Sequence, residues 1–166
     1  ETSEVLFIAV GTPPADDGSA DLRYVLEVAN SIGEYMNGYR VIVDKSTVPV
    51  GTGKLVRETI QKKLDERGVD FEFDVVSNPE FLREGKAVND CLRPDRVVIG
   101  YSDERAKEMM KKVYNVLYIN ETPFVFTSVE TAEMIKYASN AFLAVKISFI
   151  NEMALLAEKV GADVQQ

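Results

Sequence analysis

Apolar strand-like runs alternate with amphipathic helical patterns over the first 127 residues, and this alternation constrains the fold more than any other feature. The strand patterns occupy residues 5–10, 39–46, 71–77, 95–102 and 122–128, and the helical patterns occupy residues 20–36, 52–68 and 103–117. Strands that alternate with helices over short connections form parallel sheets with right-handed crossovers. We therefore predict an α/β domain with a parallel sheet and flanking helices.

The pattern changes after residue 127 to a single long helix over residues 128–160, which ends before Gly161 and contains no proline. Roughly 33 helical residues span about 50 Å, far more than one small sheet requires. The middle of this helix is apolar nearly all round, so it must be buried on several sides. Lys136, Lys146, Asn151 and Glu152 interrupt each candidate membrane window. We expect a helix that links two domains or packs against a partner subunit.

The amino-acid composition excludes several kinds of binding partner and catalytic site. The formal net charge of -8 argues against a nucleic-acid backbone as partner. The chain has no histidine, which excludes His-based triads and the common His-containing zinc sites and leaves Asp, Glu, Lys and Tyr for proton transfer. Its single cysteine, Cys91, excludes an intrachain disulfide and fits a reducing compartment, so we expect a cytoplasmic protein. With no histidine to activate it, Cys91 is expected to be a small, half-buried residue. We predict no metal site and no membrane partner.

Polar segments follow two of the predicted strands. Gly11 lies in "AVGTPP" after the first strand, and Ser46 and Thr47 lie in "DKSTVPVGTG" after the second. Ligands of doubly wound sheets bind at the carboxyl ends of the strands, and the following helix N-terminus favours anions or ordered water. The alternatives are a plain Gly-Pro turn for the first segment and helix capping for the second. The G-x-G-x-x-G fingerprint of dinucleotide-binding folds does not occur in the chain.

Two glutamates follow the third strand in "SNPEFLREG". The Asn78–Pro79 pair ends the strand, because the residue before proline avoids helical geometry. If a helical turn follows, Glu80 and Glu84 share a face, and partial desolvation raises the pKa of such a carboxyl toward that of a useful general base. The alternative is a solvated acidic surface neutralised by Arg83.

Lys136 and Asn140 share one face of the long helix because they are four residues apart. Burying both groups is costly unless each has a partner, so we expect them to face a ligand or a water-filled cleft. There they would stabilise a developing oxyanion, one by charge and one by an amide N–H. The alternative is a structural ion pair of Lys136 with Glu133 or Glu130.

Five motifs in this order, "VGTPP", "DKSTVPVGT", "SNPEFLREG", "RPDRVVIG" and "KYASNAFLAVKISFINE", resemble the UDP-glucose/GDP-mannose dehydrogenase family over essentially the whole chain, and most closely its UDP-glucose 6-dehydrogenases. The resemblance implies two successive NAD-dependent oxidations that convert UDP-glucose to UDP-glucuronate through a thioester-like intermediate on a cysteine. It also implies a role for each candidate residue.

The NAD site is implied to contain Gly11, Thr12, Pro13, Ser46, Thr47, Val48 and Glu84. Glu80 is implied to be the acid/base residue for hydrolysis of the intermediate, with Thr47 holding a water nearby. Lys136 and Asn140 are implied to stabilise the oxyanion. The substrate-binding set is Glu80, Phe81, Leu82, Arg83, Glu84, Lys136 and Asn140, with the backbone of Phe81–Arg83 against the sugar nucleotide.

The resemblance divides the chain into two parts. Residues 1–127 are implied to be the later half of a Rossmann-like NAD-binding domain, without its first strand and Gly-rich loop. Residues 128–166 are implied to be a long central helix that forms dimers. The family's catalytic cysteine lies in a segment that these residues do not match, and Cys91 occupies no matching position. We therefore expect a fragment that is inactive alone and associates as a homodimer. The alternatives are a sister dehydrogenase acting on GDP-mannose or a UDP-N-acetyl sugar, and a non-catalytic dimerising module.

Overall fold

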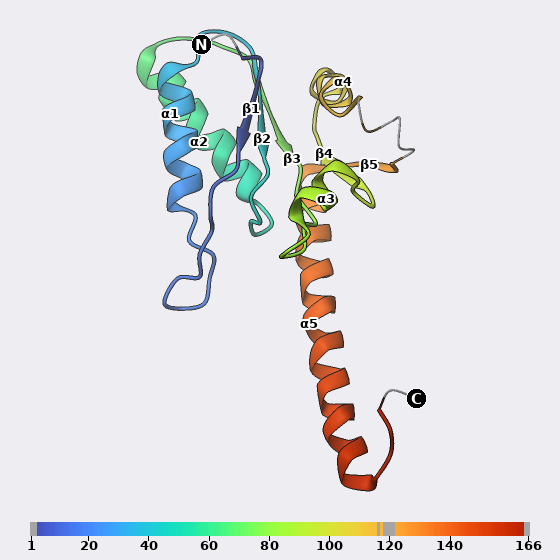
Figure 1. Ribbon diagram of the computed structural model, residues 1–166. Helices are drawn as coiled ribbons and strands as arrows, with labels where there is room; N and C mark the ends of the chain where they lie inside the picture. Colours follow the sequence, from blue (N-terminus) through green and yellow to red (C-terminus); the bar gives the residue numbers. More distant parts are fainter. Residues whose placement is uncertain (1–2, 116, 118–121, 165–166) are drawn as a thin grey trace. The chain divides into compact units, whose positions relative to one another are not determined.

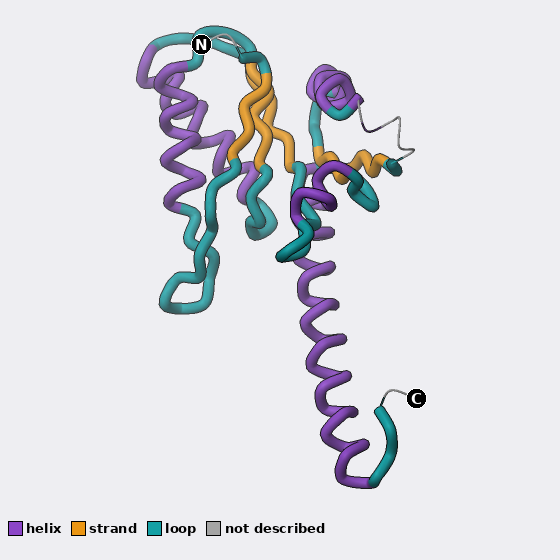
Figure 2. The backbone as a smooth tube through the Cα atoms, viewed as in Figure 1, coloured by secondary structure: helices purple, strands orange, loops and turns teal. Residues whose placement is uncertain are grey.

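The computed structural model describes residues 3–115, 117 and 122–164 (Figures 1 and 2). The chain forms two compact units, Glu1–Lys136 and Tyr137–Gln166. The elements in chain order are β1 (Val5–Ile8), α1 (Arg23–Tyr35), β2 (Arg40–Asp44), α2 (Thr52–Arg67), β3 (Phe73–Ser77), α3 (Ala87–Leu92), β4 (Val97–Gly100), α4 (Glu104–Val113), β5 (Phe124–Thr127) and α5 (Val129–Val160). The predicted strands and long helices all appear, and the short helix α3 is additional.

The five strands form one sheet in the order β1-β2-β3-β4-β5. The pairs β1–β2, β2–β3 and β4–β5 are parallel, as expected. The expectation of a fully parallel sheet is wrong at β3–β4, which is antiparallel and joined by the single pair Ser77↔Gly100. A parallel crossover needs a helix long enough to return the chain to the start of the strands. The six-residue α3 is too short for this, so β4 begins at the edge where β3 ends.

Two hydrophobic clusters cover the two faces of the sheet. Alternate residues of a strand point to opposite faces, so Ile42 packs with α1 and α2 while Val41 and Val43 pack with α4. Asp44, the next residue, ends β2 in a fully buried position. Figure 1 shows α1 and α2 together beside β1–β3, and α4 beside β4. The carboxyl ends of β1, β2 and β3 therefore emerge between two well-packed layers.

Two glycines allow the beginning of α5 to pack closely against the rest of the first unit. A Cβ on Gly53, in the first turn of α2, would lie 2.6 Å from Val129 Cγ1. A Cβ on Gly100, at the end of β4, would lie 2.6 Å from Ala132 Cβ. Larger residues would push the helix away, so these glycines fix where the first turns of α5 lie. Gly68 is the C-cap of α2, with a left-handed φ of 67°.

The second unit contains the remainder of α5, whose large apolar side chains are exposed. The predicted long helix is confirmed, with 32 residues. By length and composition alone it is able to cross a membrane. A single helix of this kind is weak evidence for a membrane span, and Lys146 and Glu152 lie within its apolar stretch.

Candidate active site

Two residues from separate parts of the chain, Thr47 and Lys136, contact Glu80. The Thr47 hydroxyl, which follows β2, donates a hydrogen bond to Glu80 Oε1 over 3.2 Å. Lys136 Nζ, on α5, donates to the Glu80 carbonyl over 2.6 Å and lies 3.6 Å from Glu80 Oε1. Lys136 is only 7% exposed, yet its charge has partners. The structure thus brings together one carboxylate, one hydroxyl and one ammonium group where β2 and β3 end.

The alternative reading of Lys136 as the partner of Glu133 or Glu130 is wrong, because its ammonium group faces Glu80. Glu133 has other partners. Its carboxylate accepts hydrogen bonds from the backbone N–H groups of Gly51 and Gly53, each over 2.7 Å. The N-terminus of α2, expected to attract an anion or water, therefore already holds a carboxylate of the protein itself. Burial raises the pKa of Glu133, and these two N–H groups oppose the rise.

Asp44 is a buried acid that the sequence patterns did not single out. It is 1% exposed, and its Oδ1 accepts a hydrogen bond from the Ser46 N–H over 3.1 Å. Its Oδ2 has no hydrogen-bond partner among the residues that the structure describes. Burial raises its pKa from 3.8 to about 7, against the opposing effect of the Ser46 N–H and with added repulsion from Glu133 and Glu80. Asp44 is therefore poised to gain or lose a proton near neutral pH.

The loops after β1 and β2 are joined by their polar groups. The Ser46 hydroxyl accepts from the Val10 N–H over 3.1 Å and donates to the Val10 carbonyl over 2.8 Å. Thr12 Oγ1 donates to the Thr47 carbonyl over 2.8 Å. Gly11 faces open space, since an added Cβ would meet nothing within 4 Å. These loops contain the expected cofactor residues Gly11–Pro13 and Ser46–Val48, except that the Val48 side chain is buried in the core.

Glu80 and Glu84 do not share a helical turn. The chain is irregular from Asn78 through Arg83, and a turn at residues 84–86 leads into α3. Arg83 fixes this segment against α3, because both its backbone N–H and its guanidinium donate hydrogen bonds to the Asp90 carboxylate. These bonds lower the pKa of Asp90 to about 2. Glu84 is exposed, and within the described residues it has no ion pair or side-chain hydrogen bond.

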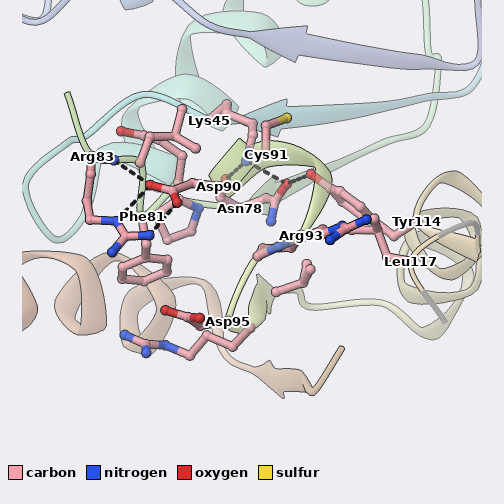
Figure 3. Close-up of a pocket in the computed structure, with 16 residues that line it drawn as sticks. Lys45, Asn78, Phe81, Arg83, Asp90, Cys91, Arg93, Asp95, Tyr114 and Leu117 are labelled. Carbon is pink, nitrogen blue, oxygen red and sulfur yellow. Dashed lines mark hydrogen bonds and ion pairs between the residues drawn. The ribbon is translucent and has the colours of Figure 1, made fainter. Parts of the chain in front are cut away.

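A cavity of about 180 Å³ lies beside this irregular segment (Figure 3). Asn78 orders one wall: its side-chain N–H donates to the Val98 carbonyl over 2.7 Å, and its Oδ1 accepts from the Tyr114 hydroxyl and from Lys45 Nζ. Burial lowers the pKa of Lys45 and raises that of Tyr114 to about 12. Cys91 also lines the cavity but is exposed, so the expectation of a half-buried thiol is wrong.

Comparison with known proteins now gives the family. Residues 1–118 match the sequence model of the UDP-glucose/GDP-mannose dehydrogenase family NAD binding domain, and residues 130–166 match that of its central domain. The chain belongs to the UDP-glucose/GDP-mannose dehydrogenase family. The resemblance drawn from the five motifs is confirmed, as is the expected NAD-binding domain.

Relatives within this family are close in sequence and in structure. The chain is 52% identical over 164 residues to the UDP-glucose 6-dehydrogenase TuaD of Bacillus subtilis, covering 99% of the chain and 34% of TuaD. It is 55% identical over 166 residues to the UDP-glucose 6-dehydrogenase of Rhizobium meliloti, covering 98% and 37%. A UDP-glucose dehydrogenase structure from Pyrobaculum islandicum superposes with a TM-score of 0.90 at 46% identity, covering 98% and 37%. The chain thus spans about a third of the length of these relatives.

Two of the predicted site residues, Asn140 and Glu84, are not part of the cluster around Glu80. Asn140 follows Lys136 by one turn of α5 and belongs to the second unit, so its role as an oxyanion donor stays a prediction. Glu84 as a cofactor contact stays a prediction as well. Conversely, Glu133 and Asp44 are buried beside the site and were not proposed from sequence. The i, i+3 spacing of Glu133 and Lys136 suggested only an ion pair between them, which the structure does not contain.

Proposed function

We propose that these residues form part of an NAD-dependent UDP-glucose 6-dehydrogenase, which oxidises UDP-glucose to UDP-glucuronate in two hydride transfers. The observation that carries this proposal is the Thr47–Glu80–Lys136 cluster at the ends of β2 and β3, in a chain of this dehydrogenase family. The close relatives in Bacillus subtilis and Rhizobium meliloti are UDP-glucose 6-dehydrogenases by name. The reducing cytoplasm is the compartment that we assign.

Glu80 takes the role of general base for hydrolysis of the covalent intermediate. Its carboxylate accepts a hydrogen bond from the Thr47 hydroxyl, so a water bound by Thr47 would lie within reach of the same oxygen. Lys136 stabilises the oxyanion that forms when this water attacks, because its charge lies beside Glu80 in a buried site. Asn140 joins it in this role.

The residues present fit an NAD molecule at the carboxyl ends of β1 and β2. Gly11 leaves room for close approach, and the bonds of Ser46 and Thr12 hold the two loops together. We assign the cofactor to Gly11–Pro13, Ser46–Val48 and Glu84, where NAD supplies the hydride acceptor. The N-terminus of α2 is not available for its phosphates, since Glu133 holds those N–H groups. The nucleotide sugar binds along Glu80–Glu84, with Lys136 and Asn140.

A second part of the proposal is a homodimer. The apolar side chains Phe142, Phe149, Ile150 and Met153 are exposed along α5, in the segment that matches the family's central domain. Soluble proteins rarely leave an apolar stripe of this length uncovered. A two-fold contact covers the same patch on both chains.

A sister activity is the competing candidate. A GDP-mannose dehydrogenase structure from Pseudomonas aeruginosa superposes with a TM-score of 0.87 at 37% identity. The higher identity to the UDP-glucose enzymes favours UDP-glucose as substrate. The remaining alternative is a non-catalytic module that dimerises.

The test is NADH production by the complete protein encoded by the reading frame that contains these residues. It is assayed with UDP-glucose, GDP-mannose and UDP-N-acetyl sugars. We expect two NADH per UDP-glucose and little turnover of the others. Preference for GDP-mannose or an N-acetyl sugar would transfer the proposal to the sister activity, and no NADH with any of them would support the module. The 166-residue chain alone is expected to produce no NADH.

A further inference from the structure

Glu133 is buried, and among the residues that the structure describes no cationic side chain pairs with its carboxylate. It is 2% exposed, and its two oxygens bind the Gly51 and Gly53 N–H groups, one each, over 2.7 Å. These donors belong to the group of N–H groups that a helix leaves unsatisfied at its N-terminus. The helix dipole favours negative charge there. The two bonds join the beginning of α5 to the beginning of α2, about eighty positions apart in the sequence.

The contact is close as well as polar. A Cβ on Gly53 would lie 2.6 Å from Val129 Cγ1 and 3.3 Å from Glu133 Oε1. The backbone of α2 at Gly53 therefore packs directly against the Val129 and Glu133 side chains of α5. Lys136 lies one turn further along the same helix and holds Glu80. The first turns of α5 thus contact both segments that contribute to the cluster around Glu80.

Thr47 lies on the short segment between β2 and α2, and both ends of that segment are fixed. At the β2 end, Ser46 is bonded to Val10. At the α2 end, Thr52 bonds the Pro49 carbonyl through its hydroxyl, and Glu133 holds the adjacent Gly51 N–H. Gly51 has a φ of 96°, in the left-handed region, so the turn before α2 has a defined geometry.

We infer that Glu133 is a positioning residue, which fixes the N-terminus of α2 and thereby holds the Thr47 hydroxyl against Glu80. The effect of Glu133 on catalysis rests on the proposed function, whereas its structural link to the N-terminus of α2 does not. A carboxylate suits the task because both of its oxygens accept hydrogen bonds. A glutamine offers one oxygen and an NH₂ group, and the NH₂ group would face a backbone N–H. Glu133→Gln therefore loses one bond and the charge at nearly constant volume.

The structural link is tested by NMR on the 166-residue chain. In Glu133→Gln we expect exchange of the Gly51 and Gly53 amide protons to accelerate at least about 10-fold, since a charge-assisted bond is lost. We also expect the Thr47 and Glu80 signals to shift. Glu130→Gln, an exposed glutamate one turn earlier, is the matched control and should change none of these. Unchanged Thr47 and Glu80 signals in folded Glu133→Gln would overturn the inference. If Glu133→Gln does not fold, the same Thr47 and Glu80 signals are measured in Glu133→Asp, which keeps a carboxylate on a shorter side chain.

The catalytic consequence is tested in the complete protein. We expect Glu133→Gln to lower kcat about 10- to 100-fold, with the KM for the nucleotide sugar within about two-fold. Combined with Thr47→Ala it should lower kcat no further than Thr47→Ala alone, because residues that act through one another are not additive. Fully additive losses would contradict the inference. If the unsubstituted protein makes no NADH, the proposed function fails, and the amide measurement still decides the positioning role of Glu133.

Discussion

The two regions of α5 present opposite surfaces. Among residues Val129–Lys136 the charged side chains of Glu133 and Lys136 are buried and bonded to other segments of the first unit. From Tyr137 onward the large apolar side chains are exposed, among them Phe142 and Phe149. A single helix therefore has buried charges at its start and exposed apolar residues afterwards, the reverse of the usual arrangement.

This difference shows that the two regions have different tasks. Buried charges are tolerated only when paired, and here they are paired with the Glu80 segment and with α2. Their arrangement is thus complete within the first unit. The exposed apolar residues of the second unit, in contrast, gain about 25 cal/mol for each Å² that a partner covers. We therefore expect substitutions in the first region to change catalysis and those in the second to change association.

The largest expected effect follows from removing the buried ammonium group. In the complete protein, Lys136→Ala should lower kcat about 100- to 1,000-fold, because its charge acts mainly as the oxyanion forms. Binding of NAD, measured by calorimetry, should weaken far less. Lys146→Ala, an exposed lysine in the second region, is the control and should stay within about two-fold. Equal losses for both lysines, or an unchanged kcat in Lys136→Ala, would break the comparison.

Association is the second expected effect. Light scattering at tens of micromolar should show the 166-residue chain as a dimer or larger oligomer. Phe149→Glu should raise the dissociation constant at least about 100-fold, because it places a charge in an apolar contact. Tyr35→Glu changes an aromatic residue that is at least as exposed but lies on α1, and it should leave the mass of the oligomer unchanged. A clean monomer of the unsubstituted chain would show that the second region is not a contact surface.

The smallest expected effect is on stability and comes from Asp44, whose pKa is raised mainly by its own burial. Its pKa of about 7 in the folded state exceeds the ordinary value of 3.8, so the folded chain binds the proton more tightly than the unfolded chain. Ionisation therefore costs stability, and this cost appears as the pH rises from about 4 and is complete above about 7.

Asp44→Asn removes that cost. We expect it to raise the free energy of unfolding by about 1–3 kcal/mol at pH ~8 and to change it little at pH ~4. Urea unfolding at both pH values measures this. Asp16→Asn, an exposed acid, is the control. A gain that is the same at both pH values would mean that Asp44 does not titrate near neutrality.

Local patterns in the sequence predict most of the fold. Strands and helices follow from apolar periodicity, and Gly68 marks the end of α2. The antiparallel junction of β3 with β4 was missed because it depends on the length of α3, which carries little periodic signal over six residues. Thr47, Glu80 and Lys136, which the structure brings together, were singled out because each follows a strand end or interrupts an apolar helix. Glu133 was misread because its partners are backbone N–H groups about eighty positions away, which no side-chain pattern reveals.

The central claim is that Glu80 acts as the base for hydrolysis, held between Thr47 and Lys136. Single-turnover kinetics of Glu80→Gln in the complete protein test it most directly, because they separate the first hydride transfer from release of the acid. The account predicts that hydrolysis slows at least about 100-fold while the first hydride transfer stays within about three-fold, since a base is needed to activate water and not to bind the cofactor. Equal slowing of both steps, or of neither, would contradict it.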